Sequence, residues 1–118
     1  MVCSNIITRE KQIIEIEELQ ENGVDYKHYK VINDTKSVKS IKRILKSASW
    51  ETTSIELSRP ADYRFIFQYK NDKYEAKAIL YQVWIPSGGK QITIMRETSQ
   101  YAVLSVEDST KLSKLFFE

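Results

Sequence analysis

The heptapeptide YRFIFQY at residues 63–69 is the clearest indication of fold in this chain. Every second residue is aromatic, and Arg64, Ile66 and Gln68 stand between the rings. Because side chains alternate between the two faces of a β-strand, the four rings share one face of a sheet. An aromatic face of this size needs a covering layer, and the chain on both sides of the heptapeptide can supply it.

Two amphipathic segments are candidates for that layer. The first spans residues 35–48, where apolar residues recur at spacings of three and four: Val38, Ile41, Ile44, Leu45 and Ala48. The side chains of Asn33-Asp34-Thr35, at the start of this segment, can accept hydrogen bonds from the free amides of a first helical turn. The second segment follows Ser105, a helix-capping residue, and carries Leu112, Leu115 and Phe116 as its apolar stripe. The sequence therefore predicts two helices.

The remaining chain has the two-residue period of β-strands. Residues 12–19 alternate apolar and acidic side chains, and Glu21-Asn22-Gly23 predicts a turn into a second strand over 24–32. Further strands are predicted within residues 53–57, 74–85, 91–96 and 101–104. Turns are expected at residues 71–72 and 86–89, which are rich in Asn, Asp, Pro, Ser and Gly.

These elements predict an α+β fold. We expect one antiparallel sheet of five or six strands with two helices packed on one face, in the order hairpin, helix, four-strand meander, helix. Residues 12–118 would form a single domain, preceded by a flexible segment at residues 1–11. Because two short helices cover only one face of such a sheet, the other face must be wet, bound to a partner or closed by curvature.

The composition is that of an ordinary globular chain, with 118 residues of which 42% are hydrophobic and 29% charged. A single cysteine, Cys3, excludes an intramolecular disulfide, and with only one histidine it excludes a structural zinc site. No apolar run approaches the roughly 20 residues that span a bilayer. We expect neither a cofactor nor a metal.

Charge is unevenly distributed along the chain. Residues 27–46 hold seven basic side chains and one acidic side chain, Asp34, although the whole chain has a net charge of only +2. Five of the basic residues fall between the apolar positions of the first predicted helix: Lys36, Lys39, Lys42, Arg43 and Lys46. Such a face can contact phosphates or lipid headgroups, or it can simply be the solvated side of an amphipathic helix.

The candidates for catalysis are weak. The only histidine, His28, lies in a predicted strand without a nucleophile nearby in sequence. Glu15 and Glu17 share one strand face with Glu18 adjacent, which suits a hard cation, an acid/base pair or, more simply, solvent. The segment 87–90, Ser-Gly-Gly-Lys, joins two strands and opens no helix, so it lacks the geometry of a phosphate loop. The sequence therefore predicts a protein that is not an enzyme.

The pattern resembles a known family. Four segments carry the likeness: DTKSVKSIKRILKSASWE at 34–51, RPADYRF at 59–65, YQVWI at 81–85 and SVEDSTKLSKL at 105–115. They are similar to small YhfM-like proteins of Gram-positive bacilli, which are uncharacterised and often lipoproteins. The resemblance covers residues 12–117 and implies a bacterial, extracytoplasmic domain, but it transfers no catalytic residue.

We therefore expect a non-enzymatic module that binds a protein or small ligand through a sheet face or edge. Residues 1–5, Met-Val-Cys-Ser-Asn, resemble the remnant of a lipoprotein signal, which makes Cys3 a candidate for lipidation and for membrane anchoring. An ordinary N-terminus, and with it a cytoplasmic protein, is the alternative. The second functional hypothesis is a module that binds anions or nucleic acid through the basic face of helix 35–48.

Overall fold

A computed structural model describes residues 12–52, 59–69, 79–86, 90–97 and 99–117. The predicted flexible segment at residues 1–11 and the lipidation candidate Cys3 lie outside them. The described elements are, in chain order, β1 (Gln12–Leu19), β2 (Tyr26–Ile32), α2 (Thr35–Ser47), β3 (Glu51–Thr52), β4 (Tyr63–Tyr69), β5 (Tyr81–Trp84), β6 (Thr93–Arg96), β7 (Gln100–Val103) and α3 (Val106–Phe117).

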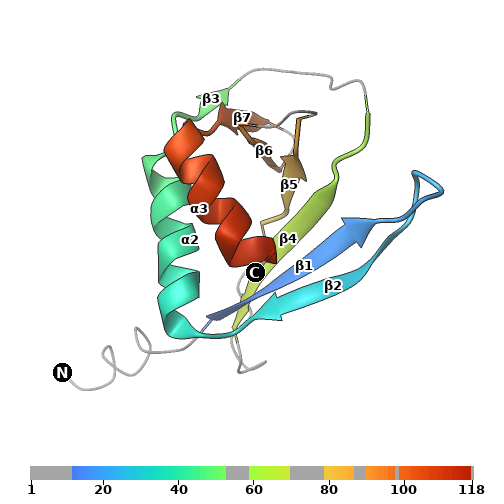
Figure 1. Ribbon diagram of the computed structural model, residues 1–118, viewed down its shortest axis with the longest axis horizontal. Helices are drawn as coiled ribbons and strands as arrows, with labels where there is room; N and C mark the ends of the chain where they lie inside the picture. The colour runs from blue at the N-terminus through green and yellow to red at the C-terminus, as the bar shows by residue number, and fades with distance from the viewer. Residues whose placement is uncertain (1–11, 53–58, 70–78, 87–89, 98, 118) are drawn as a thin grey trace.

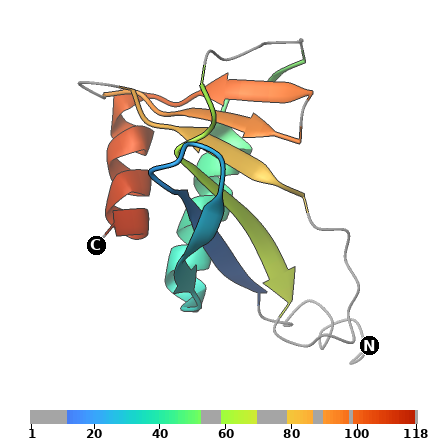
Figure 2. The ribbon, with the colours of Figure 1, turned by 90° about the vertical axis from the view of Figure 1, so that its right-hand side faces the viewer.

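The described strands form one antiparallel sheet in the order β2-β1-β4-β5-β6-β7-β3. Both helices lie on the same side of this sheet and run antiparallel to each other (Figures 1 and 2). The predicted α+β fold, with two helices on one face of a single sheet, is therefore confirmed.

The predicted number of strands was too low, because the described sheet has seven. The additional strand, β3, is only two residues long and pairs with β7 at the edge of the sheet. A two-residue strand has no periodicity that a sequence pattern could reveal. Of the long strand predicted over 74–85, the structure describes only β5. Ile79 and Leu80 precede β5 and are not part of a strand, and residues 70–78 lie outside the described residues. The strand expected within 53–57 and the turn expected at 71–72 also lie outside them, as do residues 87–89 of the other predicted turn.

The predicted hairpin turn is confirmed, and its details explain where β2 begins. Gly23 has a φ of 73°, a conformation that glycine adopts without steric cost. The Asn22 Oδ1 accepts hydrogen bonds from the backbone N–H of Val24 at 2.9 Å and of Asp25 at 3.0 Å. Because the side chain of Asn22 occupies both amides, strand β2 starts at Tyr26 and not at Val24 as predicted.

Both helices begin where the capping residues predicted. The Asp34 Oδ2 accepts from the backbone N–H of Ser37 at 2.9 Å and caps α2. The Ser105 Oγ accepts from the backbone N–H of Asp108 at 3.1 Å and caps α3. The two caps fix the register in which each apolar stripe meets the sheet.

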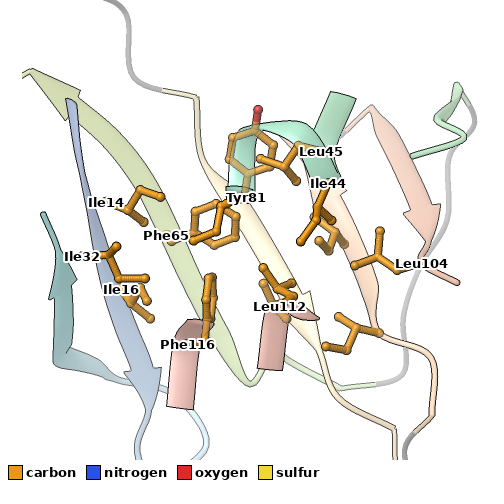
Figure 3. Close-up of a cluster of buried hydrophobic side chains, with 14 of the residues drawn as sticks. Ile14, Ile16, Ile32, Ile44, Leu45, Phe65, Tyr81, Leu104, Leu112 and Phe116 are labelled. Carbon is orange, nitrogen blue, oxygen red and sulfur yellow. The ribbon is translucent and has the colours of Figure 1, made fainter. Parts of the chain in front are cut away.

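The core lies between the helices and the aromatic face of β4. Phe65 is only 1% exposed and stacks on Tyr81 of β5, with ring centroids 4.9 Å apart. Phe116 of α3 packs edge-on against the Phe65 ring, with ring centroids 5.2 Å apart. Figure 3 shows these three rings at the centre of the cluster, with Leu45 of α2 beside Tyr81. The prediction that the rings of residues 63–67 face the helices is confirmed; the Tyr69 side chain lies outside the description.

One buried hydroxyl ties α3 to the sheet. Ser109 is 4% exposed, and its Oγ accepts a hydrogen bond from the buried backbone N–H of Ile92 at 2.9 Å. Ser109→Ala would leave that N–H without a partner, and we expect it to lower the free energy of unfolding by about 1–2 kcal/mol. Urea unfolding of Ser109→Ala beside Ser113→Ala, on the same helix, measures this cost. Equal stabilities of the two variants would contradict it.

The sheet face away from the helices is partly covered by the chain itself. Trp84 and Met95 alternate with residues of the main core and so point to this second face, yet they are only 8% and 9% exposed. Ala61 completes this smaller cluster, and the Trp84 Nε1 donates to the Arg59 carbonyl oxygen at 2.9 Å. Residues 59–62 thus seal part of the surface that the sequence pattern left unassigned.

Candidate functional site

The five basic residues of helix 35–48 do not form one continuous site. Lys42 and Lys46 line a pocket between α2 and the sheet, whereas Arg43 lines a groove between α2 and α3. Lys36 and Lys39 are exposed and line neither hollow. The structure therefore divides the predicted anion-binding face into two separate groups of cations.

The pocket beside Lys42 and Lys46, called here the aromatic pocket, has a volume of about 390 Å³. The side chains of α2, β4 and β5 give it apolar walls, and cationic groups stand at its rim. Its described lining consists of Gln12, Lys42, Leu45, Lys46, Phe67, Ile79, Tyr81 and Arg96. No carboxylate occurs in this described lining, so its three cations give it a positive charge.

Two of the three cations of the aromatic pocket, Lys42 and Arg96, are held by aromatic rings and amides. The Lys42 Nζ lies 5.7 Å from the centroid of the Phe67 ring and donates to the Gln12 Oε1. The Arg96 guanidinium carbon lies 4.2 Å from the centroid of the Trp50 ring, and its Nε donates to the Gln100 Oε1 at 2.9 Å. Within the described part of the chain, neither cation has a carboxylate partner. Both charges remain available to an anion.

The side chain of Trp50 connects the end of α2, Tyr81 and Arg96. Its Nε1 donates to the Leu45 carbonyl oxygen near the end of α2 at 2.8 Å, and its ring lies 6.4 Å from that of Tyr81. The indole therefore fixes the end of the helix and carries Arg96 on its face. A cation that is already held in position loses less conformational entropy on binding an anion than a freely moving one.

Sequence reasoning missed Arg96 as a site residue. It reaches the aromatic pocket only because β5 and β6 pair with Tyr81 opposite Arg96. No spacing in the sequence connects Arg96 with Lys42 or Lys46, which lie on a distant helix. The one available signal was the two-residue period of 91–96, which places Arg96 on the same face as Ile94 and Ile92.

The other candidates from the sequence do not converge. His28 is an exposed residue of β2, opposite Glu17 across the strand pair. Glu17 forms an ion pair with Arg64, with 2.5 Å between Oε1 and Nε, and Glu15 lines the same small hollow on the far face of the sheet. No group of three potential metal-binding side chains occurs among the residues that were described.

Glu18 contacts the helix-facing side chain of Tyr63 instead. The Tyr63 hydroxyl donates to the Glu18 Oε2 at 3.2 Å, and burial together with this carboxylate raises the pKa of Tyr63 to about 12. Since the ordinary pKa of a tyrosine hydroxyl is 10.0, Tyr63 ionises at a lower pH in the unfolded chain than in the folded one. The stability from neutral Tyr63 is therefore complete below pH 10 and disappears toward pH 12.

Tyr63→Phe tests this linkage, because phenylalanine keeps the ring and removes the titrating hydroxyl. We expect the wild-type free energy of unfolding to fall relative to that of Tyr63→Phe between pH 10 and about 12. Urea unfolding at a series of pH values measures the difference. A difference that stays constant with pH would contradict the assigned burial.

Comparisons with known proteins give one match. The family model described as YhfM protein matches residues 7–118. This match confirms the resemblance noted from the sequence. No curated protein and no solved structure matches the chain. Among the described residues, no helix has both the length and the apolar character required to cross a membrane.

Proposed function

We propose that this chain, which belongs to the YhfM protein family, is a non-enzymatic binding module for a small anion with a flat apolar body. The aromatic pocket supports this proposal. Phe67 and Tyr81 offer ring surfaces to the apolar part of a ligand, and Lys42, Lys46 and Arg96 offer positive charge to its anionic group. Ligand sites of proteins commonly combine apolar walls with a few convergent polar groups in this way.

The size of the aromatic pocket favours it over the far face of the sheet. A hollow on that face, beside Glu15, Glu17, Arg64 and Ile66, has a volume of about 90 Å³, against about 390 Å³ for the aromatic pocket. The smaller hollow also contains two carboxylates, one of them already paired with Arg64. A small anion therefore finds both more space and the complementary charge on the helix side.

The charge arrangement favours an anionic ligand over a neutral one. Three cations without a carboxylate in the described lining repel one another, and an anion between them relieves that repulsion. Arginine can bind a carboxylate through two parallel hydrogen bonds, whereas lysine acts as a point charge on a longer, flexible chain. We therefore assign orientation of the ligand to Arg96 and general attraction to Lys42 and Lys46.

A matched pair of probes tests the proposal. 2-Naphthoate and 2-naphthamide share a flat ring system and differ in charge, so calorimetric titration compares charge at constant shape. We expect the carboxylate to bind at least about tenfold more tightly than the amide, a difference of about 1.4 kcal/mol. The variant Lys42→Gln/Lys46→Gln/Arg96→Gln should remove this preference, and Lys36→Gln/Lys39→Gln, on the same helix but outside the pocket, should retain it.

Two results would count against the proposal. Equal affinities of wild-type protein for carboxylate and amide would mean that the three cations do not select an anion. A loss of preference in Lys36→Gln/Lys39→Gln equal to that in the triple variant would mean that the overall field of α2 acts, and not the pocket. Salt-sensitive binding of oligonucleotides lost in both variants would favour the nucleic-acid hypothesis instead.

For location, we propose that the module is tethered outside the cytoplasmic membrane through a lipid on Cys3. The proposal rests on the order of residues 1–5. Intact mass spectrometry of the protein from its native host should find a diacylglycerol thioether on this cysteine. An unmodified Cys3 thiol in the mature protein would refute tethering and leave the ligand proposal untouched.

A further inference from the structure

Helices α2 and α3 lie side by side and antiparallel (Figure 1), and a second hollow, called here the helix groove, is lined by residues of both. It has a volume of about 510 Å³ and shares no described lining residue with the aromatic pocket. Its described lining consists of Ser40, Arg43, Ile44, Ser47, Asp108, Lys111, Lys114 and Leu115. Both helices contribute cations, so the helix groove exists only in the folded chain.

The charges of the helix groove leave an excess of positive charge. Arg43 comes from α2, and Lys111 and Lys114 come from α3, against a single carboxylate of Asp108 in the described lining. Lys111 pairs with Glu107 at 3.2 Å, but both side chains are largely exposed, at 59% and 78%. An exposed pair of this kind is weak and exchanges readily for another anion. Across the residues described, Arg43 and Lys114 have no carboxylate partner.

The neutral lining adds hydrogen-bond donors and apolar surface. Ser40 and Ser47 stand one on each side of Arg43 along α2, and the Ser47 hydroxyl donates to the Ile44 carbonyl oxygen at 3.2 Å. A hydroxyl rotates freely enough to donate to a ligand oxygen instead. Ile44 and Leu115 supply the apolar part of the lining, and Ile44 is 4% exposed.

We propose that the helix groove is a binding site for a phosphate monoester group. Three cations against one carboxylate complement a group that carries about −1.5 to −2 at pH 7. The planar guanidinium of Arg43 can hold two phosphate oxygens at once, and the two ammonium groups of α3 can approach from the opposite side. The two hydroxyls along α2 can donate to the oxygen that remains. This site is independent of the ligand proposed for the aromatic pocket.

The charge of the ligand gives the site a pH dependence. A phosphate monoester gains its second negative charge with a pKa near 6, whereas a sulfate monoester keeps one charge throughout. Binding of methyl phosphate should therefore strengthen as pH rises from about 5 to about 7.5, and binding of methyl sulfate should not.

The experiment is an NMR titration of the full chain with methyl phosphate and, separately, methyl sulfate at constant ionic strength. At pH 7.5 we expect methyl phosphate to bind at least about tenfold more tightly than methyl sulfate. Arg43→Gln/Lys114→Gln should lose this selectivity. The control Lys36→Gln/Lys39→Gln removes two charges from α2 outside the helix groove and should keep it. All four replaced side chains are exposed, so the fold should be unaffected.

A second arm distinguishes the two sources of a phosphate monoester, a lipid headgroup and a soluble compound. Phosphatidic acid carries this group and phosphatidylglycerol does not, so vesicles of each, mixed with phosphatidylcholine, are compared by sedimentation. Selective binding to phosphatidic acid that Arg43→Gln/Lys114→Gln removes would assign the lipid source. Binding of methyl phosphate without this vesicle selectivity would assign a soluble source.

Three outcomes would overturn the proposal. They are equal binding of phosphate and sulfate monoesters, an equal loss in the control variant, and absence of binding to both methyl phosphate and phosphatidic acid vesicles. Because the helix groove and the aromatic pocket share no described lining residue, none of these results depends on the naphthoate experiment.

Discussion

Replacement of Phe65 by alanine is expected to lower the free energy of unfolding by about 3–5 kcal/mol. Phe65 is 1% exposed and contacts rings from two other elements, Tyr81 of β5 at 4.9 Å and Phe116 of α3 at 5.2 Å. Alanine would leave a cavity at the point where sheet and helix meet, and the close-packed surroundings could fill it only in part. Urea unfolding followed by circular dichroism measures the loss.

Val103→Ala is the matched control, because Val103 is also a strand residue but is 52% exposed on the far face of the sheet. We expect a change within about 0.5 kcal/mol there. A cost for Phe65→Ala below about 1 kcal/mol, or similar costs for both variants, would contradict the position of the core.

Asp62→Ala is expected to lower the free energy of unfolding by about 3 kcal/mol, although Asp62 is not in the core. One carboxylate oxygen accepts from the Arg59 Nη1 at 2.5 Å, and the other accepts from the backbone N–H of Ile85 at 2.7 Å. Arg59 also donates through its Nη2 to the Ile85 carbonyl oxygen at 2.9 Å. Alanine would remove the partner of Arg59 in the segment that covers Trp84 and leave the Ile85 N–H without a partner.

Asp62→Asn separates the charge from the hydrogen bond. Its amide oxygen can still accept from the Ile85 N–H, while the ion pair with Arg59, at 46% and 27% side-chain exposure, is lost. We therefore expect a cost of about 1 kcal/mol for this variant. Chemical unfolding of both proteins decides the point, and a loss in Asp62→Asn as large as that in Asp62→Ala would contradict the role given to the backbone amide.

Elements with a strong period could be predicted from the sequence. The aromatic alternation of residues 63–67 and the stripe of α2 each determine which side is buried, because a slip of one residue would expose apolar side chains to water. The caps at Asp34 and Ser105 fixed the helix starts through local hydrogen bonds. Strand β3 could not be foreseen, since its pairing with β7 depends on a partner about 50 residues away.

The candidate sites were predicted only in part, for the same reason. The lysines of α2 were visible as a charged face, but their division between the aromatic pocket and the helix groove depends on where Arg96 and α3 lie in space. The covered far face had a visible signal in Trp84, which stands on the side of β5 opposite Tyr81. Residues 59–62, which cover it, carry no periodicity and are held by hydrogen bonds from several strands, including those of the Asp62 side chain.

The proposed binding on the helix side of the sheet is tested most directly by mapping backbone amide shifts during titration with 2-naphthoate. We expect the amide signals of Lys42, Tyr81 and Arg96 to shift together along one binding curve, and those of Glu15 and Val103 on the far face to stay in place. Shifts concentrated on the far face or along the β2 edge, with the aromatic pocket unperturbed, would contradict it.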